Sequence, residues 1–196
     1  MHVIDLDIKH SFAKHEFDLL SVPSQSSLNV RRAEISDAED ASKIVERYLI
    51  SATVDVPLIR KIIAHNNDGF FLFEKNKKIV GLYVMLMLNE LGMEKLLHGK
   101  FDGTQPPLEQ LAKTPVSTAG IYVWAYVAPG KAANGIRYVS SFMKNNDYKY
   151  VNFFARPVTV PGFQITKNLG FQPLDGDAVG LYQYTRIINR NLNMKA

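Results

Sequence analysis

A short turn containing two glycines is the part of the sequence that could most readily hold a ligand. It reads GKAANG, with Gly130 and Gly135 at its ends and Lys131 beside the first glycine. The residues behind it, 136–146, place apolar side chains at the spacing of one helix face. Backbone N–H groups at the start of a helix are unpaired and lie at the positive end of its dipole. The turn therefore predicts a site that faces an anionic ligand.

Three aromatic residues alternate along the apolar run that precedes this turn: Tyr122, Trp124 and Tyr126. Alternate residues of a strand point to the same face of a sheet, so the three predict one aromatic face. The smaller residues between them would form the other face: Ile121, Val123, Ala125 and Val127. An aromatic face could line a pocket for an acyl group or its acceptor, although it is more often core beneath a helix.

Residue types exclude or disfavour several other chemistries. The chain has no cysteine, which excludes disulfides, thiol catalysis and thiolate metal sites. Its five histidines lack the H-E-x-x-H spacing of a zinc site, and no metal site is predicted. There is no G-x-S-x-G or Walker sequence. Lys and Arg residues are scattered rather than clustered, which argues against nucleic-acid binding.

The turn belongs to a predicted strand–helix–strand–helix unit. Its expected elements are a strand at 119–127, a helix at 136–146, a strand at 148–155 and a helix at 161–171. Two successive strands joined through a helix make a parallel pair. A parallel pair is therefore expected after 119–154.

The residues before this unit predict a strand and two helices. The strand is expected at 30–35, and Ser36 and Glu39 then have the spacing of a capping box. The pattern behind the box predicts an amphipathic helix over 38–49. Asp55 is placed as the N-cap of a second helix.

Tight turns mark two antiparallel strand pairs. The runs 69–75 and 78–88 flank a turn at Asn76, and 78–88 is apolar on both faces, so it should lie centrally. A closing pair is expected at 171–174 and 179–187.

Together these elements predict one α/β (α+β) domain. Its sheet would be mixed and mostly antiparallel, with the parallel pair after 119–154 and helices on both faces. Residues 1–28 are expected to form an N-terminal extension or linker. A single domain would span 29–196, with an irregular insertion at 89–118 that could be a lid or could cap a core edge.

Composition is that of an ordinary globular domain. The 196 residues suit one domain, and a hydrophobic content of 46% can fill a substantial core. No apolar run reaches the roughly 18–20 residues needed to span a bilayer. The N-terminus does not resemble a signal peptide, so we expect a cytoplasmic protein without membrane partners. A net charge of +4 is compatible with an anionic small molecule.

The order of elements, the turn at 127–137 and the segment 159–171 resemble the GNAT superfamily of acyl-CoA N-acyltransferases. The resemblance covers nearly the whole predicted domain. In that family a V-x-P-x-x-R-G-x-G-x-G turn wraps the pyrophosphate of coenzyme A with its amides. Val127, Pro129 and Gly135 match it here.

The resemblance implies an acyl-CoA donor, acetyl-CoA or another, and an amine acceptor of unknown identity that attacks the thioester directly. A homodimer is left open. The implied coenzyme-binding residues surround the turn: Val127, Ala128, Gly130, Lys131, Ala132, Ala133, Asn134, Gly135 and Arg137.

The sequence departs from the family pattern at positions that usually do chemistry. The Arg or Gln of the turn is Ala132 here, and its last small residue is Arg137. The family's N-x-x-A-x-x-x-Y-x-k-x-G-F motif keeps its final Gly-Phe pair, but its Tyr, which commonly protonates the departing thiolate, is Thr166. A threonine hydroxyl can offer a hydrogen bond but is too weak an acid near neutral pH.

The general base is also missing from its expected place, because strand 119–127 contains no acid. Glu90, which follows the end of the predicted central strand, is our candidate base, and Thr166 is our candidate hydrogen-bond donor. An exposed acid at a strand end is the plainer interpretation of Glu90.

Three functions stay open at this stage. The first is an acyl-CoA-dependent N-acyltransferase, most simply an N-acetyltransferase. The second is a ligand-binding or dimerisation module that has the fold without the chemistry, which the exchanges at Ala132, Arg137 and Thr166 favour. The third is an acyltransferase that uses long acyl chains or acyl-carrier-protein donors, with the insertion at 89–118 shaping a long pocket.

Overall fold

The computed structural model of the chain describes residues 28–49, 55–145 and 147–186. All but the last residue of the extension expected at 1–28 lies outside these residues, as does the tail after Arg186. Within the described ranges, no helix is both long and apolar enough to cross a bilayer.

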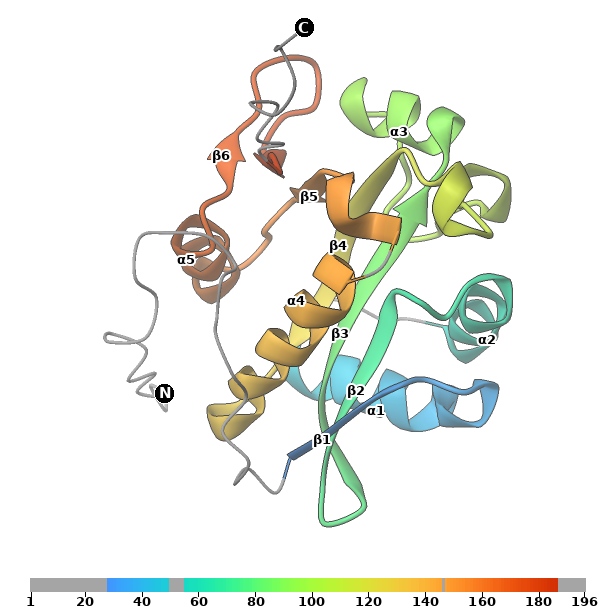
Figure 1. Cartoon of the computed structure of the whole chain (residues 1–196), viewed down its shortest axis with the longest axis vertical. Helices are drawn as coiled ribbons and strands as arrows, with labels where there is room; N and C mark the ends of the chain where they lie inside the picture. The colour runs from blue at the N-terminus through green and yellow to red at the C-terminus, as the bar shows by residue number, and fades with distance from the viewer. Residues whose placement is uncertain (1–27, 50–54, 146, 187–196) are drawn as a thin grey trace, which may run out of the picture.

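One seven-stranded sheet forms the centre of the described structure (Figure 1). Its order is β1-β2-β3-β4-β5-β7-β6, and β4 and β5 run parallel while all other neighbours are antiparallel. The predicted mixed, mostly antiparallel sheet with one parallel pair is therefore confirmed. The strands are β1 (Leu28–Arg32), β2 (Phe70–Lys75), β3 (Lys78–Leu88), β4 (Gly120–Val127), β5 (Phe153–Ala155), β6 (Gln172–Pro173) and β7 (Tyr182–Tyr184).

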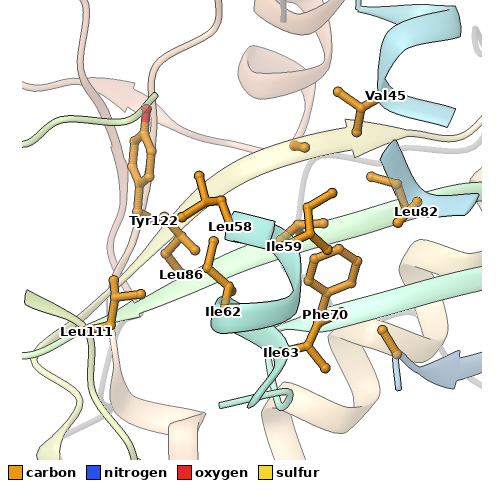
Figure 2. Close-up of a cluster of buried hydrophobic side chains, with 14 of the residues drawn as sticks. Val45, Leu58, Ile59, Ile62, Ile63, Phe70, Leu82, Leu86, Leu111 and Tyr122 are labelled. Atoms are coloured by element: carbon orange, nitrogen blue, oxygen red, sulfur yellow. The ribbon is translucent and has the colours of Figure 1, made fainter. Parts of the chain in front are cut away.

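Helices cover both faces of this sheet, as predicted. The face that we call the α1/α2 face is covered by α1 and α2, whose buried side chains form one cluster with alternate residues of β3 and β4. The opposite, α4 face forms a second cluster that includes buried residues of α4. Figure 2 shows the first cluster, with Leu58 and Ile62 of α2 beside Leu86 of β3. The helices are α1 (Ala38–Tyr48), α2 (Val56–His65), α3 (Glu90–Leu97), α4 (Gly135–Asn145) and α5 (Val160–Asn168).

The hairpin of β2 and β3 is confirmed, and its turn explains the sequence at its tip. Asn76 and Lys77 both have positive φ, 52° and 59°. Two successive left-handed residues make a type I′ turn, whose twist matches that of paired strands. β3 is buried over most of its length and lies third in the sheet, so its apolar pattern on both faces did indicate a central strand.

Two local expectations are wrong. The strand expected at 148–155 is only β5, because residues 147–150 form a short 3-10 helix. There the ring of Tyr148 is buried and its hydroxyl donates a 2.9 Å hydrogen bond to Asp68, which ties this segment to the residues just before β2. The capping box before α1 is also displaced, since Glu34 and Asp37 form it instead of Ser36 and Glu39.

Asp37 is held by several hydrogen bonds that explain the displaced box. Its carboxylate accepts two hydrogen bonds from the Arg31 guanidinium, at 2.7 and 2.8 Å, and one from the Glu34 amide at 2.7 Å. Arg31 donates a further 2.8 Å bond to Glu74 of β2, so the cluster joins β1, β2 and the start of α1. Hydrogen bonding to Arg31 is the main cause that lowers the pKa of Asp37 below its usual 3.8.

This cluster predicts an acid-sensitive contribution to stability. Because the folded-state pKa of Asp37 is lowered, its contribution is fully present above about pH 4 and is lost as pH falls through the folded-state pKa. We expect Asp37→Asn to lower the unfolding free energy near pH 7 by about 1–3 kcal/mol and to flatten its fall in acid. Chemical denaturation between about pH 7 and pH 2 measures both effects.

The matched control is Asp40→Asn, because Asp40 is exposed and forms an ion pair with Lys43, three residues away on α1. Its effect should stay within about 0.5 kcal/mol. An equal loss of unfolding free energy in both variants would show that the Arg31–Asp37 contact contributes no more to stability than an exposed ion pair.

The start of α4 packs directly on the ring of Phe73 in β2. A Cβ at Gly135 would lie 2.6 Å from an edge carbon of this ring, and Phe73 is fully buried. The glycine therefore allows α4 to approach the sheet at the point where the turn before it ends.

We expect Gly135→Ala to destabilise the protein by about 1–3 kcal/mol through overpacking. Combining it with Phe73→Leu should recover part of the loss, because the smaller side chain leaves room for the methyl group. Gly130→Ala is the control: Gly130 has φ +56° and nothing within 4 Å of an added Cβ, so its cost is backbone strain alone. Denaturant unfolding would compare Phe73→Leu, the two glycine variants, and each glycine variant combined with Phe73→Leu. An equal recovery of stability for both glycine substitutions would contradict this account.

Candidate functional site

β4 and β5 pair over three residues and then separate. Their parallel register runs from Ile121 opposite Phe153 to Val123 opposite Ala155. β4 continues for four more residues, 124–127, while β5 ends. In the described part of the chain no strand pairs with β4 on this side beyond Val123. Its backbone N–H and C=O groups there can therefore pair with a ligand that lies along the strand.

A β-bulge lies at the start of this unpaired stretch. Val84 of β3 is opposite Ala125, but the next residue, Met85, is opposite Val123, which leaves Trp124 as an extra residue in β4. A bulge of this kind shifts the alternation of side chains by one position.

The bulge makes the predicted single aromatic face wrong. Tyr122 and Trp124 pack on the α1/α2 face, whereas Tyr126 packs on the α4 face. There Tyr126 meets Tyr83 of β3 edge to face, with ring centroids 5.4 Å apart. The two faces of the separated strands therefore carry different aromatic residues.

The glycine turn follows the end of β4 directly and begins a continuous helical run. Gly130–Asn134 forms a 3-10 helix that passes into α4. The Ala132 amide donates to the Pro129 carbonyl at 3.2 Å, and the Gly135 amide donates to carbonyls within the turn. The first amides of the run, those of Gly130 and Lys131, are the ones that a helix start leaves for a ligand.

The residues predicted to bind a coenzyme differ in how accessible they are. Val127, Ala132 and Gly135 are buried, and Gly135 faces Phe73 rather than open space. Gly130 and Asn134 are exposed. Ala128, Ala133 and Arg137 are partly buried, and the side chain of Lys131 lies outside the described part of the structure.

Thr166 lies on α5 with its hydroxyl already in use. Its side chain is buried, and Oγ1 donates a 2.8 Å hydrogen bond to the Gly162 carbonyl one turn earlier. A hydroxyl that bonds back to its own helix has no second proton to donate. Thr166 could therefore accept a hydrogen bond from a ligand but would have to break this contact to donate one.

Glu90 lies at the opposite end of β4 from the turn. It is the exposed first residue of α3, directly after β3, whose last residue Leu88 is paired with Gly120 at the start of β4. Seven residues separate Gly120 from Val127, which corresponds to about 23 Å along a strand. The structure therefore does not bring Glu90 and the glycine turn together.

The insertion packs beside the separated strands, through contacts that the sequence did not identify. Phe101 meets Tyr122 edge to face at 5.6 Å between centroids, and the Trp124 indole donates a 2.6 Å hydrogen bond to the Gly103 carbonyl. Asp102 fixes the loop, because one of its carboxylate oxygens accepts bonds from the Thr104 and Gln105 amides. A hydrogen bond from the Thr104 hydroxyl is the main cause that lowers the pKa of Asp102, and the two amide bonds add to it.

Arg156 lies beside the separated strands and was not among the residues that the sequence predicted for the site. It follows the last residue of β5, where this strand leaves β4, and its Nε is buried without a hydrogen-bond partner. The one signal in the sequence was a charged residue directly after a buried strand. Such a position can equally be a solvated strand end.

The tyrosines of the site stay protonated near neutral pH. Burial raises the pKa of Tyr83 and Tyr126 well above 10. Burial also raises the pKa of Tyr122, although the positive charge of Arg156 partly opposes the rise. These phenols can donate hydrogen bonds but cannot serve as bases.

Other features of the described residues do not add to this site. Two surface hollows of about 570 and 540 Å³ lie elsewhere, one beside the Arg31–Asp37 cluster and one beside His65 and Asn89. Among residues 28–49, 55–145 and 147–186, no group of three or more His, Asp or Glu side chains could hold a metal ion.

No protein-family model and no curated protein sequence matches this chain. Solved structures do match. The loading GNATL domain of CurA from Lyngbya majuscula is 14% identical, with a TM-score of 0.60, and the match covers 81% of this chain and 97% of that domain. YncA from Salmonella typhimurium, solved with its cofactor acetyl-CoA, is 14% identical with a TM-score of 0.51, covering 87% of this chain and 100% of that one.

A GNAT-family acetyltransferase from Staphylococcus aureus Mu50 is 10% identical, with a TM-score of 0.50, and the match covers 82% of this chain and 99% of that one. At these identities the likeness concerns the fold and not the individual side chains. The strand order, the separated parallel pair and these matches all indicate the same fold. The chain has the fold of the GNAT superfamily of acyl-CoA N-acyltransferases.

Proposed function

We propose that the protein is an acyltransferase that moves an acyl group from an acyl-CoA, most simply acetyl-CoA, to an amine. The observation that carries this proposal is the unpaired edge of β4, residues 124–127, which leads directly into the first amides of the helical run at Gly130. A donor with amide groups along its arm and a pyrophosphate at its end suits both features. YncA, which has this fold, was solved with acetyl-CoA, and this supports the proposal.

The donor would lie on the α4 side of the separated strands. Its pyrophosphate would accept hydrogen bonds from the Gly130 and Lys131 amides, and its pantetheine amides would pair with β4. The acyl group would then lie where β4 and β5 part, near Val123 and Ala155. In this arrangement the thioester would lie between the two faces of the sheet, where an amine could reach it.

Catalysis would depend on positioning and on hydrogen bonds to the developing oxyanion rather than on a strong acid or base. The tyrosines near the divergence are protonated, and Tyr126 on the α4 face could donate a hydrogen bond to the departing thiolate. The catalytic roles of Glu90 and Thr166 stay predictions.

A second candidate is a ligand-binding or dimerisation module that has kept the fold without the chemistry. The turn favours it in one respect, because the Ala132 and Gly135 amides already have partners. Use of long acyl chains or carrier-protein donors is a variant of the first candidate, and the insertion that packs on Tyr122 is compatible with it. Donor binding separates these alternatives.

Asn134→Asp tests the proposed phosphate position. Asn134 is exposed and is the last residue of the short 3-10 helix that begins at Gly130. A new negative charge there should weaken acetyl-CoA binding by about threefold to tenfold at low salt. The same charge lies just before α4 and should slightly stabilise the free protein. Calorimetric titration and thermal unfolding measure the two effects, which have opposite signs.

Asn168→Asp is the matched control, since Asn168 is an exposed asparagine at the other end of a helix, α5. It should leave acetyl-CoA affinity unchanged and slightly destabilise the protein. Unchanged binding in Asn134→Asp would mean that the phosphate lies elsewhere. Binding weaker than about millimolar by the unaltered protein, for acetyl-CoA and a long-chain acyl-CoA alike, would sink the acyl-CoA proposal.

Glu90→Gln and Thr166→Val test whether either residue does acid–base chemistry. General acid–base catalysis is worth about 100-fold to 10,000-fold, so we expect each variant to keep kcat within about tenfold. The chain has no cysteine, so a thiol reagent reports released coenzyme A without a background from the protein. The assay uses acetyl-CoA as the donor and a panel of amines as acceptors. A loss of 100-fold or more in one variant would assign that residue a proton-transfer role.

A further inference from the structure

Arg156 has an unusual position for an arginine. Its Nε is buried and has no hydrogen-bond partner, although buried polar atoms are nearly always paired. No carboxylate of the described residues pairs with its side chain. A buried N–H without a partner is costly, and binding sites are where such a cost is commonly offset by a ligand.

The surroundings of Arg156 place it on the α1/α2 face of the separated strands. Phe154 and Tyr122 are neighbours across β4 and β5 and both belong to the cluster on this face. Arg156 follows β5 directly, two residues after Phe154. Its charge also acts on the Tyr122 hydroxyl. Figure 2 shows this hydroxyl directed away from the aliphatic side chains of α2.

The insertion makes this corner rigid. The backbone of Gly103 lies beside the Tyr122 hydroxyl, since an added Cβ there would be 3.6 Å from it. Trp124 is tied to the same glycine by its indole hydrogen bond, and Asp102 holds the loop through the amides that follow. Tyr122 and the Gly103 backbone are thus positioned before any ligand arrives.

We propose that Arg156, with the Tyr122 hydroxyl, binds the carboxylate of the amine acceptor, and that the acceptor is a free amino acid. This inference rests on the proposed function, in which the donor occupies the α4 side of the gap. The amine must then approach the thioester from the α1/α2 side, where Arg156 lies at the end of β5. A guanidinium and a phenol both donate to a carboxylate. The partly exposed ring of Trp124, beside this corner, favours an acceptor with an apolar or aromatic side chain.

The single tryptophan of the chain is Trp124, so its fluorescence reports on this corner. We expect L-phenylalanine, titrated with the full chain, to change the Trp124 emission saturably, and L-phenylalaninamide to bind at least about tenfold more weakly. The two probes share the amine and the ring and differ only in the carboxylate. Arg156→Gln should abolish this preference, and Arg156→Lys should keep part of it, because lysine retains the charge but not the planar fork.

Arg60→Gln is the matched control, since Arg60 is exposed and pairs with Glu39 at 3.0 Å on the surface of α1 and α2. It should bind both probes as the unaltered protein does. Thermal unfolding identifies any variant that fails to fold, and Arg156→Lys keeps the test valid if Arg156→Gln does. Acetyl-CoA affinity, titrated separately, should be unchanged in every variant.

Equal binding of the two probes, or full carboxylate preference in folded Arg156→Gln, would overturn the assignment. So would inorganic phosphate competing better than phenylalanine, because the corner would then hold a phosphate. If phenylalanine binds through Arg156 but acetyl-CoA does not bind at all, the proposed function fails and the carboxylate site stands. Loss of acetyl-CoA binding on altering Arg156 would instead place this residue in the donor site and contradict the inference.

Discussion

The candidate site depends on backbone hydrogen bonds that β4 does not make. A buried strand normally satisfies its N–H and C=O groups on both sides, but beyond Val123 the partner β5 turns away. The turn at Gly130 begins where this free edge ends, and Arg156 lies where β5 leaves. The bulge at Trp124 sets which side chains face each way along the gap. One interruption of the sheet thus leaves a free strand edge beside the turn and gives the two faces different aromatic residues.

Most of the fold follows from periodicity and turn chemistry, which are local. The alternating and doubly apolar runs indicated the strands, and Asn76 marked the hairpin because it can adopt positive φ. The Trp124 bulge could not be predicted in this way, because it depends on the register with β3 and not on the sequence of β4 alone. The error about Tyr126 follows directly, since a single extra residue inverts the side chains after it. β5 was overestimated for a related reason: Tyr148 is buried through a distant contact with Asp68.

The candidate site was predictable only in its contiguous part. The glycine turn could be found because its residues are neighbours in the sequence, whereas the occupancy of its amides depends on the 3-10 geometry that the chain adopts there. Glu90 was chosen by chain order, which does not reveal that it lies at the opposite end of β4 from the turn. Arg156, Tyr122 and Gly103 are separated by tens of residues and meet because of sheet pairing and the packing of the insertion. No periodicity encodes such a meeting.

The contact between Gly135 and Phe73 has a consequence for how this site could evolve. At Gly135, where the turn ends, the backbone packs on a buried core ring, a contact that uses none of the side chains pointing outward. Outward positions such as Asn134 can therefore accumulate substitutions while the backbone keeps its course. A descendant could lose, regain or exchange its ligand by altering a few exposed residues without having to fold anew.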